Sequence, residues 1–328
     1  MKSKTFYLKL LMVALVALLA KSNVGEAVAA EQQPLIIGAG GVSGAYYPAG
    51  GAVASLVNRN SGTSGIRLAV EPSLRASLDN VLGILTGNLA MGMVQSDVQS
   101  LAVNRQGPFA QSAGTGKLRV LFSLYSEAFT VVVGKDSGIK AFSDLKGKRV
   151  AMGTPGASYW TTAELFMREY GWTTDDVHTV QDISADGMGK ALCAGQVDAF
   201  IYAIGHPYAM IQDAVSQCGA SIISLDGKER AAFMEKYAYY PAAVIPAGMY
   251  APESHAVQTF GPQATLMASS NMPDDTAYFI VKTVFENFDA FKRMVPVFSE
   301  LRKEDMVKGG SAPLHPGALR YFKEAGLL

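Results

Sequence analysis

The chain has few of the residues that build metal centres: two cysteines and four histidines among 328 residues. The histidines are His178, His206, His255 and His315, and no H-x-x-x-H or His/Cys grouping appears. Zinc sites need three or four such ligands at characteristic spacings. The sequence therefore predicts no metal site.

An excess of charge of one sign is also missing. Lys and Arg together number 28, Asp and Glu together number 28, and the formal net charge is zero. Domains that bind nucleic acid show a basic patch or stripe, because they neutralise phosphates. We therefore expect no nucleic-acid partner.

Signatures of common enzyme classes are missing as well. The esterase pattern G-x-S-x-G does not occur, and no nucleophile paired with a base is visible. Residues 38–44 read G-x-G-G-x-x-G, which resembles a dinucleotide-binding loop. The acidic residue that would hold a ribose about 20 positions further on is missing. We expect a binding protein that is not an enzyme and uses no cofactor.

Long apolar runs are confined to the N-terminus. Leu10–Ala20 is unbroken and apolar, about half the ~20 residues that a membrane span needs, and three lysines precede it. Ala27-Val28-Ala29 is a small-x-small cleavage site. These features predict a signal peptide over residues 1–29 and a soluble periplasmic protein after its removal. An uncleaved anchor helix is the alternative.

Export also bears on the two cysteines. In an oxidising compartment a single pair usually forms a disulfide. We therefore expect a disulfide between Cys193 and Cys218.

Strand-like apolar runs alternate with amphipathic helical segments along the chain. This rhythm predicts an α/β fold with parallel sheets covered by helices on both faces. Lobe 1 is expected at residues 30–126 plus 243–328 and lobe 2 at 127–242, with crossings near Tyr125–Phe129 and Tyr240–Ile245. The helix predicted at Pro273–Phe288 and a terminal helix at 317–325 would return to the first lobe.

Each half of the chain opens with the same loop pattern. Gly38 to Ser43 and Gly153 to Ser158 both read G-x-x-G-x-S, follow a predicted strand and lead into a helix. Chance is the alternative, because Gly-rich turns are common in α/β units. If the two lobes face each other, both helix N-termini point into one cleft and favour a carboxylate ligand.

These loops predict the ligand site. A carboxylate would lie between Ser43–Tyr47 and Ser77–Asn80, while Gly156–Trp160 would hold the far end. The candidate ligand-binding residues are Ser43, Tyr46, Tyr47, Arg75, Ser77, Asn80, Gln95, Ser96, Gly156, Ser158, Tyr159, Trp160 and His206.

Several of these candidates have structural alternatives. Tyr46 and Tyr47 are consecutive and should point different ways, so either one could face the cleft. Arg75 could pair with a carboxylate or remain a solvated surface charge. His206 could cap a helix, and the serines are typical helix caps as well.

Six strings in order resemble the TAXI family, the solute-binding components of one class of TRAP transporters. They run from residue 41 to residue 317 and read Gly41-Val42-Ser43-Gly44-Ala45-Tyr46-Tyr47-Pro48, Met91-Gly92-Met93-Val94-Gln95-Ser96-Asp97, Asp144-Leu145-Lys146-Gly147, Asp198-Ala199-Phe200, Gly205-His206-Pro207 and Ala312-Pro313-Leu314-His315-Pro316-Gly317.

The resemblance implies a two-lobed periplasmic-binding-protein-like (type II) fold that closes over a small carboxylate such as glutamate, glutamine or 2-oxoglutarate. It also implies delivery to a TRAP-type membrane permease. An exported sensor or surface interaction protein of the same fold is the alternative. The family's Gly-Ser-x-x-Asn turn is altered here, because Ala76 stands where the family has glycine and Arg75 precedes it.

Overall fold

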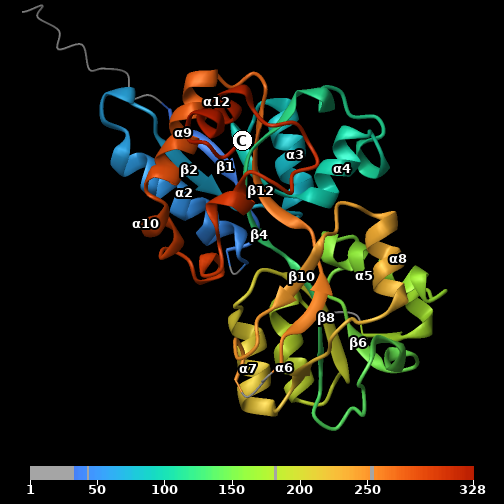
Figure 1. The fold of residues 1–328 in the computed structure, drawn as a ribbon. Helices are drawn as coiled ribbons and strands as arrows, with labels where there is room; N and C mark the ends of the chain where they lie inside the picture. Colours follow the sequence, from blue (N-terminus) through green and yellow to red (C-terminus); the bar gives the residue numbers. More distant parts are fainter. Residues whose placement is uncertain (1–32, 43, 181–182, 252–254) are drawn as a thin grey trace, which may run out of the picture. The chain divides into compact units, whose positions relative to one another are not determined.

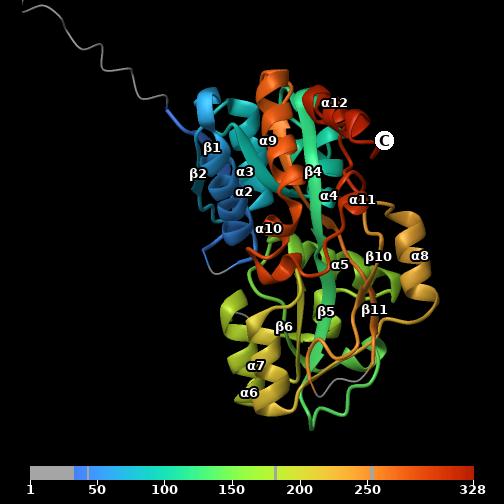
Figure 2. The same ribbon diagram turned by 60° about the vertical axis from the view of Figure 1, so that its left-hand side comes forward.

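The computed structural model describes residues 33–42, 44–180, 183–251 and 255–328. The predicted signal peptide, its cleavage site and Ser43 lie outside these residues. All the elements that follow belong to the unit Pro34–Leu328. Figures 1 and 2 show two views of its helices and strands.

The first of two five-stranded sheets has the strand order β2-β1-β3-β12-β4. Strand β1 runs parallel to β2 and β3, whereas β12 runs antiparallel to both β3 and β4. The strands are β1 (Leu35–Gly38), β2 (Leu68–Glu71), β3 (Met91–Gln95), β4 (Leu118–Ser126) and β12 (Gln263–Ser269).

The second sheet has the order β7-β6-β8-β5-β9. Strand β6 is parallel to β7 and β8, and β5 is antiparallel to β8 and β9. Its strands are β5 (Ala128–Val133), β6 (Arg149–Ala151), β7 (His178–Thr179), β8 (Ala199–Ile204) and β9 (Ser221–Ile222); β10 (Ala242–Ile245) and β11 (Val257–Phe260) form a separate antiparallel pair.

The expectation of parallel sheets is only partly met, because each sheet combines parallel and antiparallel pairs of strands. Strands β4 and β5 are apolar and largely buried, so their sequences show none of the alternation that marks a one-sided antiparallel strand. A strand buried on both faces reads the same in either direction, and the pattern could not reveal which way it runs.

Helices cover both faces of the first sheet. One apolar cluster joins this sheet to helices α2, α9 and α12, and another joins it to α3 and α4. The helices of this half are α2 (Tyr46–Asn60), α3 (Ser77–Thr86), α4 (Ser96–Val103), α9 (Asp274–Glu286), α10 (Phe288–Lys292), α11 (Lys303–Met306) and α12 (Pro316–Glu324).

The second sheet also has a cluster on each face. The one under α5 and α8 is rich in aromatic rings, with Phe166 packed against Phe129, Phe233 and Phe260. A disulfide joins Cys193 to Cys218 at the ends of α6 and α7, with a Cα–Cα distance of 5.3 Å. The helices are α5 (Ser158–Glu169), α6 (Met188–Cys193), α7 (Ala209–Cys218) and α8 (Lys228–Lys236).

The chain passes between the sheets at two places. Glu127 alone separates β4 from β5, and Gly261-Pro262 separates β11 from β12. The side chains of β10 and β11 lie in the clusters of the second sheet, before β12 returns to the first. The lobe boundaries drawn from the sequence at residues 126 and 243 stay a prediction.

Within the part of the chain that the structure describes, no helix combines the length and the apolar character that a membrane crossing needs.

Candidate functional site

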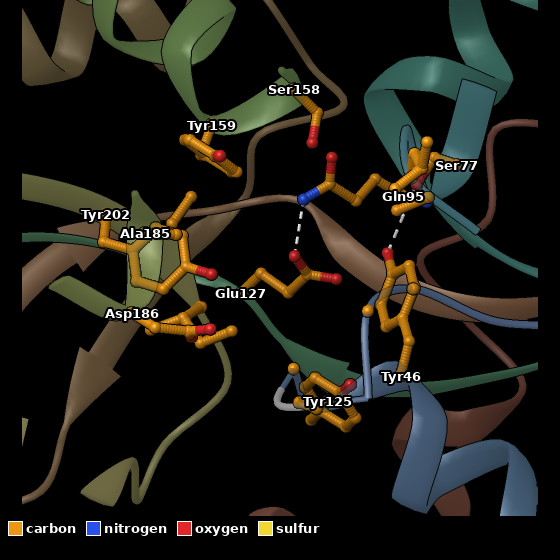
Figure 3. A pocket seen from close by; sticks show the side chains of 18 residues that line it. Tyr46, Ser77, Gln95, Tyr125, Glu127, Ser158, Tyr159, Ala185, Asp186 and Tyr202 are labelled. Carbon is orange, nitrogen blue, oxygen red and sulfur yellow. Dashed lines mark hydrogen bonds between the residues drawn. The ribbon is translucent and has the colours of Figure 1, made fainter. Parts of the chain in front are cut away.

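A cavity of about 200 Å³ opens between side chains of the two sheets. Figure 3 shows Glu127 near its centre, Gln95 and Ser158 above it, and Tyr125 below it. The lining comprises Gly40, Gly41, Gly44, Ala45, Tyr46, Leu74, Ala76, Ser77, Gln95, Tyr125, Glu127, Ser158, Tyr159, Ala185, Asp186, Tyr202, Ala203 and Ile204.

Asn80 fixes the loops on the first-sheet side. Its Nδ2 donates to the carbonyl oxygens of Ala39 at 3.0 Å and Met93 at 2.8 Å. A Cβ at Gly38 would collide with the Asn80 side chain, so glycine permits this close approach. Asn80 is fully buried and does not line the cavity, and it ties the loop after β1 to the middle of β3.

Ser77 holds two lining residues in place. Its Oγ accepts a hydrogen bond from the backbone N–H of Gln95 at 3.1 Å and lies 3.4 Å from the Tyr46 hydroxyl. Ala76 just before it has φ +43° and ψ −113°, a conformation that favours glycine. This is the position at which the chain departs from the Gly-Ser-x-x-Asn pattern.

Glu127 is the central acidic group, with 4% of its surface exposed. Its Oε2 accepts a hydrogen bond from Gln95 Nε2. Burial raises the pKa of the Glu127 carboxyl to about 8, hydrogen bonds from Tyr46 and Gln95 oppose that rise, and the charge of Asp97 adds to it. At pH 7 the ligand-free protein therefore holds most of this group as the neutral acid.

The backbone of Glu127 is clamped by the second crossing of the chain. Its N–H donates to the carbonyl oxygen of Pro262 at 2.8 Å. A Cβ at Gly261 would collide with the Glu127 carbonyl, so glycine is required for the two crossings to pack this closely.

Three polar atoms of the lining are buried without a hydrogen-bond partner: Gln95 Oε1, Tyr125 Oη and Glu127 Oε1. Native structures contain few such atoms, because leaving each one unpaired costs roughly 1–3 kcal/mol. These three atoms lie in one cavity, where each can hydrogen-bond a group that enters it.

The second-sheet wall is aromatic. The rings of Tyr159 and Tyr202 meet edge to face with centroids 5.0 Å apart. Ser158 is the first residue of α5. The side chains of Asp186 and Tyr208 are hydrogen-bonded to each other. Figure 3 shows Tyr159, Tyr202 and Asp186 across the cavity from Ser77 and Tyr46.

The structure brings five of the predicted site residues together around this cavity: Tyr46, Ser77, Gln95, Ser158 and Tyr159. Tyr46 is buried at the cavity, whereas Tyr47 packs against the first-sheet core. Their roles as ligand contacts stay predictions.

The other described candidates lie outside the lining. Arg75 pairs with Asp79 at 2.6 Å, and its side chain is 62% exposed. Ser96 donates to the Tyr239 carbonyl oxygen, Trp160 donates to Glu164, and Gly156 is exposed.

His206 makes structural contacts. It hydrogen-bonds the Thr130 and Tyr250 hydroxyls at 2.8 and 2.6 Å. Burial lowers the pKa of His206 to about 3, so the ring is neutral.

Sequence reasoning missed Tyr125, Glu127, Asp186 and Tyr202. A signal for Glu127 was present, because it is the only charged residue in the mainly apolar segment from residue 120 to residue 133. An isolated acid between two buried strands has to be either neutral or paired.

Among the described residues, no group of three or more His, Cys, Asp or Glu side chains is arranged to hold a metal ion. The side chains that line the cavity carry hydroxyl, amide, carboxyl and aromatic groups.

Several solved structures resemble this chain over most of its length at low sequence identity. A protein from Bordetella bronchiseptica RB50 is 17% identical, with 91% of this chain and 90% of that chain covered and a TM-score of 0.51. A putative periplasmic sulfonate-binding protein of an ABC transporter from Methylobacillus flagellatus KT is 18% identical, with 90% and 88% covered and a TM-score of 0.49. The periplasmic aliphatic sulphonate binding protein from Escherichia coli is 16% identical, with 88% and 78% covered and a TM-score of 0.49.

The predicted fold class is confirmed: the chain has a two-lobed α/β fold of the periplasmic-binding-protein kind, with helices flanking each sheet. A family model matches residues 37–326, nearly all of the unit that carries both sheets. The chain belongs to the NMT1-like family.

Proposed function

We propose that this chain is an exported solute-binding protein that captures a small organic molecule between its two sheets and passes it to a membrane permease. The observation that carries the proposal is the cavity itself. It is lined from both sheets and holds three buried polar atoms that lack partners. A ligand that bridges the sheets would satisfy these atoms and favour a closed arrangement.

Transport fits the lining better than catalysis. The described lining residues include the hydroxyls of Ser77 and Ser158, yet none of them is a histidine or cysteine. A serine nucleophile needs a base within hydrogen-bond reach. Hydrogen-bonding groups set around an aromatic wall are typical of binding sites for small solutes.

The resemblance to the TAXI family extends this proposal to a small carboxylate and a TRAP-type permease. Helices α2, α3 and α5 all begin at the cavity, where Tyr46, Ser77 and Ser158 stand in their first turns. Unpaired N–H groups at such helix starts suit a carboxylate. Partnership with the permease is tested by uptake of labelled solute into vesicles that hold the candidate permease, with and without this chain.

Solute binding is tested by a thermal-shift screen of amino acids, 2-oxo acids, amines and sulfonates. Protein that was unfolded, dialysed and refolded is used, so that a co-purified solute cannot mask the result. A true ligand at 100 times its Kd should stabilise the folded protein by about 2.7 kcal/mol. Calorimetry on each hit then gives the Kd, and a panel that leaves the melting temperature unchanged throughout would refute the proposal.

A further inference from the structure

The three open polar atoms of the cavity can all accept hydrogen bonds once Glu127 is ionised. Gln95 donates its amide N–H to Glu127, which leaves Gln95 Oε1 and Glu127 Oε1 without partners. The Tyr125 hydroxyl is the third open group. A ligand group that fits them has to supply several hydrogen-bond donors, as a primary ammonium does.

The charges of the lining point the same way. Its acidic members are Glu127 and Asp186, and no Lys, Arg or His occurs among the described residues that line it. Gln95, Tyr125 and Glu127 are all buried, so a charge placed there would be screened little by water. A ligand whose only charge is negative would meet acidic groups without a cationic side chain to offset them.

Aromatic rings complete the surroundings. Tyr46, Tyr125, Tyr159 and Tyr202 all line the cavity, and Figure 3 shows them around Glu127. Burial raises the pKa values of Tyr46, Tyr125 and Tyr202 well above the ordinary value, so these phenols stay neutral. Neutral tyrosine rings attract cations through their faces.

The geometry points to a ligand that carries a protonated amine, with Glu127 as its ionic partner and Gln95 and Tyr125 as further acceptors. The inference rests on the proposed solute-binding function and goes beyond it by naming the group that the ligand must carry. An amino acid meets this requirement and also offers a carboxylate to the helix starts, whereas a 2-oxo acid lacks the amine.

Binding of an amine would displace a proton from Glu127. The ligand-free group is mostly neutral at pH 7, because burial raises its pKa to about 8. The groups that face it are Tyr46, Tyr125, Tyr202 and Asp97, and of these Asp97 has a pKa raised by burial to about 6. Affinity for an amine should therefore rise by up to about tenfold per pH unit between pH 6 and 8.

The test is calorimetric titration with two series of probes, each made of an amino acid, its 2-oxo acid and its decarboxylated amine. One series is glutamate, 2-oxoglutarate and 4-aminobutanoate; the other is leucine, 4-methyl-2-oxopentanoate and 3-methylbutylamine. At least one amine-bearing probe should bind more than about tenfold tighter than its 2-oxo acid, as expected for a lost hydrogen-bonded charge pair. Its affinity should rise with pH.

Glu127→Gln keeps the shape of the side chain and should weaken that amine about 10- to 100-fold while making its affinity independent of pH. Glu235→Gln on exposed α8 is the matched control and should bind like wild type. Asp97→Asn controls for the second titrating acid and should preserve the pH slope. Thermal melts of each variant show that it is folded.

The outcomes separate the two proposals. If a 2-oxo acid binds as tightly as its amine partner, or Glu127→Gln leaves amine binding unchanged, solute binding stands and the amine requirement falls. A carboxylate held by neutral Glu127 would instead lose affinity as the pH rises. If no probe in either series and no solute in the thermal-shift panel binds, both proposals fall.

Discussion

The two walls of the cavity differ in how their side chains are held. On the first-sheet side, Tyr46, Ser77 and Gln95 are buried and joined to each other through Ser77. On the second-sheet side, Ser158 and Tyr159 are half-buried, and the wall is built mainly from aromatic rings. The polar side chains of the first wall are therefore held in place by hydrogen bonds, whereas the second wall presents mainly aromatic surface to the cavity.

The cores behind the walls differ as well. Behind the first wall, Asn80 hydrogen-bonds the loops to the sheet, while the second sheet rests on packed phenylalanines and a disulfide. Hydrogen bonds fix the orientation of the groups that they join, whereas apolar packing chiefly fixes how closely neighbouring elements approach each other. Substitutions behind the first wall should therefore change ligand affinity, whereas substitutions behind the second wall should change the free energy of unfolding.

The largest effect is expected from removing the disulfide of the second half. Cys193→Ser with Cys218→Ser opens a link between residues 25 apart in sequence, which should lower the free energy of unfolding by about 3.5 kcal/mol on the chain-entropy model. Urea unfolding of the double variant and of wild type measures the difference. Ligand affinity under folding conditions should stay within about twofold, since neither cysteine lines the cavity. Equal unfolding midpoints would show that the link contributes nothing to stability.

Glu127→Gln should stabilise the ligand-free protein. The Glu127 pKa rises from 4.5 to about 8 on folding, so the folded state binds the extra proton. The stability that this proton brings is complete below pH 4.5 and is lost as the pH rises through 8. At pH 7 the glutamine variant should therefore be more stable by roughly 3 kcal/mol, with the gain vanishing near pH 4.

Urea titrations of both proteins at pH 4, 5.5, 7 and 8 test this pH dependence. Glu235→Gln, exposed on α8, should follow wild type at every pH. A difference between Glu127→Gln and wild type that does not change with pH would contradict the burial of a neutral acid.

Two serines compare the walls directly. Ser77→Ala removes the acceptor of the Gln95 N–H and the neighbour of the Tyr46 hydroxyl, so affinity for the best ligand of the screen should fall about tenfold. Ser158→Ala on the second wall should weaken the binding free energy of the same ligand by less than about 0.5 kcal/mol. Calorimetry on both variants decides, and a larger loss for Ser158→Ala would reverse the roles of the two walls.

Ala76→Gly is expected to act on the first wall by relieving strain. The φ of +43° is costly for alanine, although glycine gives back part of the gain through the entropy of the unfolded chain. A net stabilisation of about 1 kcal/mol should appear as a higher melting temperature. A lower melting temperature would mean that alanine is well tolerated at this turn.

The smallest effect is expected from Arg75→Ala. Arg75 is largely exposed and pairs with Asp79 four residues on, and such pairs contribute about 0.5 kcal/mol or less. Affinity should be unchanged by calorimetry at low and high salt. A salt-sensitive loss of affinity would restore the alternative in which Arg75 contacts the ligand's carboxylate.

Most of the fold followed from the periodicity of the sequence. The helix predicted at Pro273–Phe288 is α9 (Asp274–Glu286), and the terminal helix predicted at 317–325 is α12 (Pro316–Glu324). The direction of the strands did not follow, because strands buried on both faces carry no alternation. Strand β12 was missed altogether, although it lies in the middle of the first sheet.

The site was partly predictable, for a physical reason. Ser77 and Ser158 begin helices after Gly-containing turns, and that local chemistry can be read from neighbouring letters. Glu127 reaches the cavity from the crossing between the sheets and Tyr202 from the second sheet, and no local sequence pattern records that these two residues meet. Tyr46 and Tyr47 could be separated only once α2 was packed against the sheet.

The clamp on Glu127 has a consequence for how the shape of the cavity can diverge between relatives. Gly261 touches the backbone of Glu127, yet it is not among the residues that line the cavity. Any side chain at position 261 would push the carboxyl group to a new place while every lining residue kept its identity. A survey of relatives that aligns lining residues alone would therefore overlook position 261 as a determinant of the shape of the cavity.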